Sequence, residues 1–178
     1  MEKCNKLLSI VLVGIVAVML CNAMPVRAYS YVKTGSAYKE VKKFRSTRGV
    51  WCWEKGSQKK KYFNTNKDNT LPKLKKSSEL EKVAKRRAKE VAKKFSHKRP
   101  NGKQWYSCYP KWKYLGENIT MGYDTGKEAV ISWEETDNKY ANQKHRRNIL
   151  SKHYNKVGIA GYRKGGVTYW TMALGYKK

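Results

Sequence analysis

The chain has 178 residues, of which 40 are Lys or Arg and 13 are Asp or Glu, so its formal net charge at pH 7 is +27. This length suits one domain with a real core, and the absence of internal repeats, long linkers and a glycine-rich phosphate loop excludes repeat architectures and P-loop nucleotide binding. The charge attracts polyanions such as wall polymers, acidic glycans, anionic lipid or nucleic acid, although scattered lysines also serve simply to keep a protein soluble.

The first 28 residues have the pattern of a secretory signal peptide. Lys3 and Lys6 precede an apolar run at residues 7–20, and small or apolar residues surround a cleavage point after Ala28. The run is shorter than the roughly 20 residues that span a membrane, so an uncleaved anchor is the less favoured alternative. We therefore expect residues 1–28 to be removed and the remaining chain to be extracellular.

Beyond this leader the chain has two cysteines, Cys52 and Cys108. An even pair in an oxidising compartment predicts a disulfide bond, and closing this loop would stabilise the fold by about 4 kcal/mol. Two free thiols are the alternative. The lack of a Cys-x-x-Cys spacing argues against a redox or zinc-thiolate role.

The first predicted elements after the leader are a short helix and a hairpin. Tyr38, Val41 and Phe44 recur at helical spacing. Short aromatic runs at residues 50–53 and 61–63 flank a polar, glycine-containing stretch, which is typical of a hairpin. The two tryptophans of the first run are expected to pack rather than to bind a ligand.

A second helix is predicted from a capping box at residues 78–81, with an apolar stripe that continues to Phe95. Its opposite face is basic. We interpret this face as solvated, and a polyanion-binding face is the alternative. The basic residues of that face are Lys82, Lys85, Arg86, Lys89 and Lys93. His97 falls just beyond the helix, ahead of a turn at Pro100 to Gly102.

Two more helices and a pair of strands complete the pattern. A capping box at residues 125–128 predicts a third helix whose inner face continues to Tyr140. Residues 145–150 predict a short helix. Two β-rich segments, 157–162 and 167–176, are joined by a glycine-containing turn and predict a hairpin.

His97, Glu117 and His145 form the candidate site, since each lies beside a turn or a helix boundary rather than inside an apolar run. Two imidazoles and a carboxylate suit a zinc ion or acid–base chemistry. No nucleophile-elbow motif and no His-Glu-x-x-His motif accompany them. We therefore favour a buried polar network over a ligand site, and a ligand site over a catalytic one.

Six motifs in a fixed order resemble the CAP superfamily, the SCP-like extracellular proteins, in its bacterial form. They are H-K-R-P-N-G, G-E-N-I-T, A-V-I-S-W, H-R-R-N-I-L, V-G-I-A-G and Y-W-T-M-A-L-G-Y. The resemblance covers residues 75–178 and implies an α+β fold, a three-layer α-β-α sandwich. Residues 29–74, with the first helix and the aromatic segment, are expected to be part of that domain or to lead into it.

The resemblance also implies a cavity lined by two histidines and two acids, in which the histidines can hold a divalent metal such as zinc. Carried over by motif, three of these residues are His97, Glu117 and His145. The second acid should lie three residues after Trp133, where this chain has Thr136. Its neighbour Glu135 is the candidate replacement, although helical geometry would turn it about 100° away.

The residue before the second histidine also departs from the family pattern. Bacterial relatives commonly have a glycine there, whereas this chain has Lys144. A lysine beside a metal ligand disfavours a bound cation unless its side chain points to solvent. A zinc ion or another divalent cation on His97 and His145 is thus a candidate cofactor, but none is required. His153 matches no family site and is expected to be exposed, and Asn118 is expected to stabilise the fold rather than to carry a glycan.

The leading hypothesis is a secreted, non-enzymatic ligand-binding module, for which the resemblance implies a lipid or sterol. One alternative is a metal-dependent hydrolase with His97 and His145 as ligands and Glu117 as general base. Another is a cationic protein that binds an anionic cell-wall polymer or glycan, with affinity that falls as salt rises. Nucleic acid is not an expected partner, and the sequence leaves the oligomeric state open.

Overall fold

The computed structural model describes residues 29–136 and 143–178. The predicted signal peptide and Tyr140 of the predicted third helix lie outside these described residues. Within them, no helix is long and apolar enough to cross a membrane.

The centre of the molecule is an antiparallel sheet with the strand order β1-β6-β7-β5, and short β4 pairs in parallel with β6. The strands are β1 (Ser30–Val32), β4 (Lys75–Lys76), β5 (Leu115–Met121), β6 (Lys156–Lys164) and β7 (Val167–Gly175). The predicted hairpin is confirmed as β6 and β7. Gly165 and Gly166 form its turn with φ angles of 56° and 80°, a conformation that two-residue hairpin turns require.

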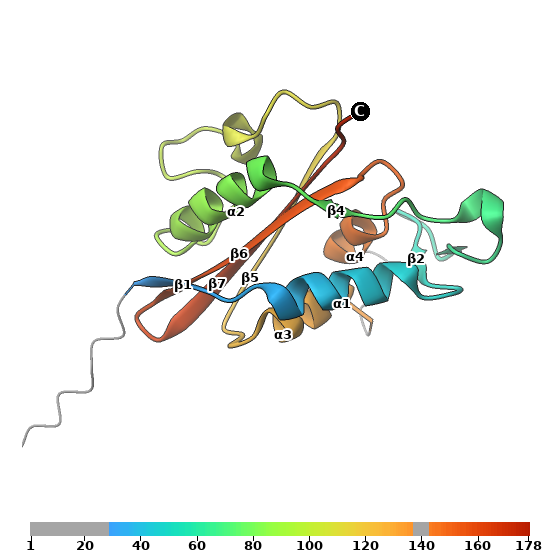
Figure 1. The fold of residues 1–178 in the computed structure, drawn as a ribbon, viewed down its shortest axis with the longest axis horizontal. Coiled ribbons are helices and arrows are strands. Elements are labelled where there is room, and N and C mark those ends of the chain that lie inside the picture. The colour runs from blue at the N-terminus through green and yellow to red at the C-terminus, as the bar shows by residue number, and fades with distance from the viewer. Residues whose placement is uncertain (1–28, 137–142) are drawn as a thin grey trace, which may run out of the picture.

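Helices cover both faces of this sheet, which confirms the predicted α-β-α sandwich (Figure 1). One face carries α2 (Ser78–Val91) and the short 3₁₀ helix η2 (Trp105–Cys108). The other carries α1 (Gly35–Ser46), α3 (Gly126–Glu134) and α4 (Lys144–Ile149). The remaining elements are the hairpin of β2 (Trp51–Trp53) and β3 (Lys60–Tyr62) and the 3₁₀ helix η1 (Lys67–Asn69).

The core is divided by the sheet into two apolar clusters. Alternate residues of one strand point to opposite faces, so Met172 of β7 packs under α1 and α3 while Ala173 packs under α2. The α2 side is thin, because the backbone of α2 lies against Gly158: a Cβ at Gly158 would come within 2.1 Å of the Leu80 carbonyl carbon. The α1 side holds the largest buried side chains, Trp133 and Trp170.

Three details of the helices differ from the sequence-based expectation. The N-cap of α2 is Ser77, whose hydroxyl accepts from the Leu80 N–H at 3.3 Å, so the predicted capping box was one residue too late. The helix ends at Val91, which leaves Phe95 47 % exposed instead of buried. The third helix begins as predicted but ends at Glu134, where Glu135 turns into the left-handed region.

The predicted disulfide bond is wrong: Cys52 and Cys108 are both free. Cys52 is buried in the cluster beneath α1 and α3, whereas Cys108 packs against the cluster beneath α2, so the sheet lies between them. Burial raises the pKa of both thiols, which keeps them protonated and unreactive.

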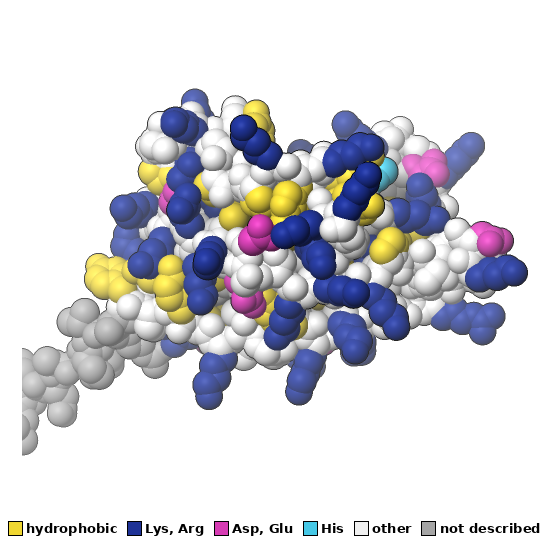
Figure 2. Space-filling view, turned by 45° about the horizontal axis from the view of Figure 1, so that its top comes forward, with side chains coloured by type: hydrophobic (Ala, Val, Ile, Leu, Met, Phe, Trp, Pro, Cys, Tyr) yellow, Lys and Arg dark blue, Asp and Glu magenta, His cyan; other side chains and the backbone are white. Residues whose placement is uncertain are grey.

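Cations far outnumber acids, with 40 Lys and Arg against 13 Asp and Glu in the chain. Figure 2 shows Lys and Arg side chains spread over the visible face with few acidic side chains among them. The five basic residues predicted for the second helix are all exposed, as expected for a solvated face, although Lys93 lies beyond the end of α2. His153 is exposed as predicted and stacks on Tyr114 at 4.5 Å.

Candidate functional site

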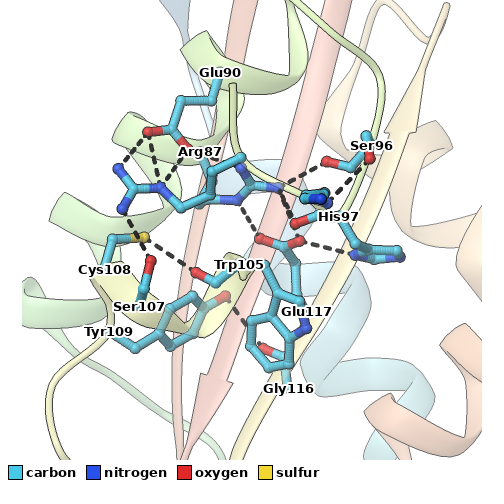
Figure 3. Close-up of polar contacts among 12 residues, drawn as sticks. Arg87, Glu90, Ser96, His97, Trp105, Ser107, Cys108, Tyr109, Gly116 and Glu117 are labelled. Atoms are coloured by element: carbon cyan, nitrogen blue, oxygen red, sulfur yellow. Dashed lines mark hydrogen bonds and ion pairs between the residues drawn. The ribbon is translucent and has the colours of Figure 1, made fainter. Parts of the chain in front are cut away.

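The first histidine–carboxylate pair joins the end of α2 to the middle of β5. His97 lies in the turn after α2, and its Nδ1 is 2.8 Å from Oε1 of Glu117 (Figure 3). The Glu117 side chain is 1 % exposed, whereas that of His97 is 51 % exposed. Because an ion-paired carboxylate only accepts, Nδ1 is the donor, and Nε2 on the far side of the ring stays available to a ligand.

Arg87, on the buried face of α2, holds the Glu117 carboxylate in place. Its side chain is fully buried and contacts both carboxylate oxygens, with Nε 2.7 Å from Oε2 and Nη2 3.1 Å from Oε1. The same Nη2 donates to the carbonyls of Ser96 and His97 at 2.9 and 3.3 Å. Arg87 thus fixes the carboxylate and the backbone of its histidine together.

A second ion pair completes this buried network. Glu90 accepts from Arg87 at 2.8 Å and from Arg99 at 2.6 Å. Burial opposes the charge on Arg87, but its bonds to Glu117 and Glu90 outweigh that cost and raise its pKa. Burial likewise opposes the charge on Glu90, yet Arg99 and Arg87 together lower its pKa. The network therefore stabilises the turn that carries His97.

Arg87 was not predicted as a site residue, because charged helix positions were taken to be solvated. The signal was present, however, since Arg87 follows Ala84 by three residues and precedes Val91 by four. This spacing places an arginine in the apolar stripe of the helix. A charge there requires a buried acid opposite it.

The second pair joins α3 to α4. His145 Nδ1 is 2.7 Å from Oε1 of Glu135, and Oε2 of Glu135 accepts the backbone N–H groups of His145 and Arg146 at 3.1 and 3.3 Å. Glu135 has a φ of 47°, so it has left the helix and the predicted 100° rotation does not apply. The carboxylate beside His145 is therefore Glu135, while Thr136 is exposed.

Neighbouring residues of the edge strand β5 connect the two pairs. Glu117 belongs to the first pair, and Asn118 donates from Nδ2 to the His145 carbonyl at 3.1 Å. Asn148 of α4 donates to Oδ1 of Asn118 at 2.9 Å and to the Glu117 carbonyl at 3.2 Å. Asn118 is fully buried, which confirms its predicted role as a fold-stabilising hydrogen bonder.

The described residues supply only part of a metal centre. In both pairs a carboxylate engages Nδ1, as it commonly does for histidines that bind a metal through Nε2. Yet no group of three or more His, Cys, Asp or Glu in residues 29–136 and 143–178 is arranged to hold a metal ion. Zinc sites in proteins use three or four protein ligands, so these residues do not fit a tight zinc centre. Lys144 is exposed.

A separate cavity of about 510 Å³ lies between α1 and the segment at residues 64–76. Its floor is apolar and includes Tyr38, Val41 and Leu71. Five cations and no Asp or Glu are among its lining residues. The cations are Lys42, Arg45, Lys73, Lys75 and Lys76. This cavity was not predicted from the sequence, because its walls come from separate segments of the chain.

Arg45 is the most unusual residue of this cavity. Only 4 % of it is exposed, and it donates to the backbone carbonyls of Pro72, Ile149, Ser151 and Tyr154. No carboxylate of the described residues forms an ion pair with it. Burial without a counter-ion lowers its pKa to about 10, so at neutral pH it remains a buried, uncompensated cation.

Comparison with solved structures shows where this fold recurs. An outer surface protein of Borrelia burgdorferi matches with a TM-score of 0.58 at 17% identity, covering 85% of this chain and 100% of that one. An extracellular SCP-domain protein of Bacillus anthracis matches at 0.50 and 23% identity, covering 60% of this chain and 35% of that one. A venom allergen-like protein of Schistosoma mansoni matches at 0.51 and 16% identity, covering 78% and 83%.

The family is shown by comparison of the sequence with family models. No curated protein matches the chain. The family model described as "CAP: Cysteine-rich secretory protein family" matches residues 38–174, which include most of α1 and all the quoted motifs up to Leu174. The matched region is most of the chain, and the solved structures share its fold. The chain therefore belongs to the CAP family of cysteine-rich secretory proteins.

Proposed function

We propose that the chain is an extracellular, non-enzymatic binding protein whose ligand is a single-chain anionic amphiphile, such as a long-chain fatty acid. The cavity beneath α1 carries this proposal, because it combines an apolar floor with five cations and no acid. Its volume of about 510 Å³ lies within the range of small-molecule sites, roughly 300–1,000 Å³.

The apolar floor favours an acyl chain. The aliphatic side chains of Val41, Leu71 and Val157 line the cavity and belong to the buried core, so an acyl chain here would lie against them. Each methylene removed from water contributes about 0.8 kcal/mol. A chain of several methylenes thus supplies enough free energy for specific binding.

The charge of the cavity favours an acidic headgroup over a neutral sterol. Arg45 already uses its donors on carbonyl groups, so it offers a ligand its charge rather than new hydrogen bonds. Lys42, Lys73 and Lys75 are exposed at the rim, where an ammonium can reach a carboxylate. Charges interact more strongly near the low-dielectric interior than in water, so the headgroup belongs beside Arg45.

A titration with matched ligands tests this proposal. Palmitate should bind saturably at one site, and hexadecanol, which has the same chain without the charge, should bind at least about tenfold more weakly. Cholesterol should bind more weakly still. If no fatty acid binds saturably, or if the alcohol and the acid bind equally, the proposal fails.

A pair of tryptophan variants locates the site. Leu74 is a partly buried residue of the cavity wall, so Leu74→Trp should fill the cavity and abolish palmitate binding. Ile131 is 48 % exposed on α3 and is not a lining residue, so Ile131→Trp should bind as the wild type does. Thermal unfolding of both variants establishes that each one is folded.

For the two histidine–carboxylate pairs we propose a role in holding the fold, without catalysis. Both oxygens of Glu117 accept from Arg87, so this carboxylate is committed to Arg87 and His97 rather than to activating a water. A divalent cation such as zinc would have two imidazoles to bind, those of His97 and His145, and would be held weakly. Stoichiometric zinc that resists dialysis and is lost in His97→Ala would contradict this and favour the hydrolase alternative.

A further inference from the structure

A cluster of tyrosines and lysines lies on the molecule outside both the histidine pairs and the α1 cavity. Strand β1 pairs with β6 so that Tyr31 is directly opposite Tyr162, and their ring centroids are 5.4 Å apart. Tyr29 stacks on Tyr162 at 6.4 Å. We call this cluster, together with Lys85 and Lys89 of α2, the tyrosine–lysine surface.

The aromatic rings hold the lysines in place without neutralising them. The Lys89 ammonium lies 5.3 Å from the Tyr31 ring and 5.6 Å from the Tyr162 ring, and the Lys85 ammonium lies 5.8 Å from Tyr31. The Tyr31 hydroxyl donates to the Lys85 carbonyl at 3.2 Å, which ties β1 to α2. A cation–π contact orients an ammonium but leaves its charge free to meet an anion.

The basic stripe of α2 extends this surface into a line of charge. Lys82 and Arg86 flank the two central lysines on the exposed face of the helix, and exposed Lys93 follows just beyond its end. None of these five cations forms an ion pair with a carboxylate of residues 29–136 or 143–178. At 1.5 Å per residue the helical part of the stripe, from Lys82 to Lys89, is about 10 Å long, and Lys93 continues it beyond the helix, which suits a linear polyanion rather than a single small anion.

A small cavity beside the stripe adds groups that bind hydroxyls. It has a volume of about 240 Å³ and is lined by Tyr31, Lys85, Lys33, Thr34 and Glu81, among others. A carboxylate such as Glu81 repels phosphate and sulfate but accepts a hydrogen bond from a sugar hydroxyl. Cations beside a hydroxyl acceptor match a polymer that carries both anionic groups and free hydroxyls.

We propose that the tyrosine–lysine surface and the adjoining stripe of α2 bind a linear anionic polysaccharide. Single-stranded nucleic acid is a poorer match, because such binders offer open aromatic faces on which bases stack. Here Lys89 lies over the rings of Tyr31 and Tyr162, and Tyr29 stacks on the latter. The surface therefore presents ammonium groups over the rings of Tyr31 and Tyr162, and Tyr29 is its most exposed ring at 64 %.

Binding to heparin, a sulfated polysaccharide, tests the proposal with two charge-matched variants. Lys85→Gln with Lys89→Gln should lower the affinity at least about tenfold, with a smaller salt dependence. Lys55→Gln with Lys59→Gln removes the same charge from exposed positions near the β2–β3 turn and should lower it less than about threefold. Equal losses in the two variants would show that only net charge matters and would overturn the proposal.

Two further measurements separate this site from its alternatives. Tyr31→Leu keeps every charge but removes the ring that orients the lysines, so it should weaken heparin binding several-fold, whereas Tyr31→Phe should restore it. Wild-type affinity in Tyr31→Leu would contradict the role of the ring. An oligothymidylate or anionic vesicles that displace heparin at equal charge concentration would assign the surface to nucleic acid or membrane instead.

Discussion

The two histidine–carboxylate pairs have the same geometry at Nδ1 but are held by different forces. Glu117 is fixed by a buried guanidinium, whereas Glu135 is fixed by the first backbone N–H groups of α4 and by its own left-handed backbone. The first arrangement depends on charge compensation in the interior, and the second on local chain geometry. Loss of the partner charge should therefore disrupt the His97–Glu117 pair, whereas a change in the local backbone should disrupt the His145–Glu135 pair.

The largest effect is expected from Arg87→Met. This change leaves Glu117 and Glu90 without their shared partner beneath α2, and an unpaired buried charge costs about 3–5 kcal/mol of unfolding free energy. Urea unfolding measures the loss. The neighbouring exposed variant Arg86→Met should stay within about 0.5 kcal/mol of the wild type. A loss below about 1 kcal/mol in Arg87→Met would show that Glu117 is not held by charge.

A smaller loss is expected from Glu135→Ala. It removes the acceptor of the His145 ring and of two backbone N–H groups, which should cost about 1–3 kcal/mol. The cost is lower than for Arg87→Met because His145 is 30 % exposed and water can replace part of the bonding. Thr136→Ala, at the family's usual acid position, serves as the control and should be neutral. If the Thr136 variant were the more damaging, the assignment of Glu135 would be wrong.

The stability contributed by Glu90, near the first pair, and by Glu134, near the second, should change with pH in opposite directions. Although burial opposes its charge, Arg99 and Arg87 depress the pKa of Glu90, so its stabilisation is present above pH 4.5 and is lost as the pH falls through the lowered value. Burial and nearby Glu40 raise the pKa of Glu134, beside Glu135, so the protonated form favours folding and this stability is lost as the pH rises through the raised value.

Glutamine variants separate these two contributions. Glu90→Gln should destabilise the protein at pH 7 and have a smaller effect near pH 4. Glu134→Gln should stabilise it at pH 7 and be neutral near pH 4, since it removes a buried charge whose Oε1 has no hydrogen-bond partner in the described structure. Unfolding curves at the two pH values measure both, and matching pH profiles in the two variants would contradict the contrast.

The smallest effect is expected from a reductant. A disulfide between Cys52 and Cys108 would join the two sides of the sheet, but both thiols are free and lie in separate clusters. The unfolding free energy should therefore be the same with and without dithiothreitol. A loss of about 4 kcal/mol on reduction would mean that the bridge forms after all.

Local patterns allowed single elements to be predicted, whereas the sandwich architecture followed from the resemblance to the CAP superfamily. The third helix and the last hairpin follow directly from the capping box at Thr125 and the paired glycines. Both histidines and Glu117 were also found, since short motifs carry them. The pattern could not show that the chain leaves the helix at Glu135, because one left-handed residue reverses the direction of a side chain without any change of composition.

The failures have a common physical origin. Arg87 is a charged residue in the core, but arginines are mostly exposed in proteins, so the sequence predicts a surface position for it. Cys52 and Cys108 are an even number of cysteines, but the count does not show whether the two residues lie close together in the fold. The cavity beneath α1 is built from segments that meet only in three dimensions. Each of these features depends on a partner distant in sequence.

The attachment of both histidine pairs to adjacent residues of β5 has a consequence for how this strand can vary. Side chains alternate between the two faces of a strand, so a slip of one residue against β7 would exchange the positions of Glu117 and Asn118. Glu117 would then leave Arg87, and Asn118 would leave the His145 carbonyl, in a single event. Substitutions along β5 can be absorbed one at a time, but a one-residue insertion or deletion ahead of Glu117 would dismantle both pairs together.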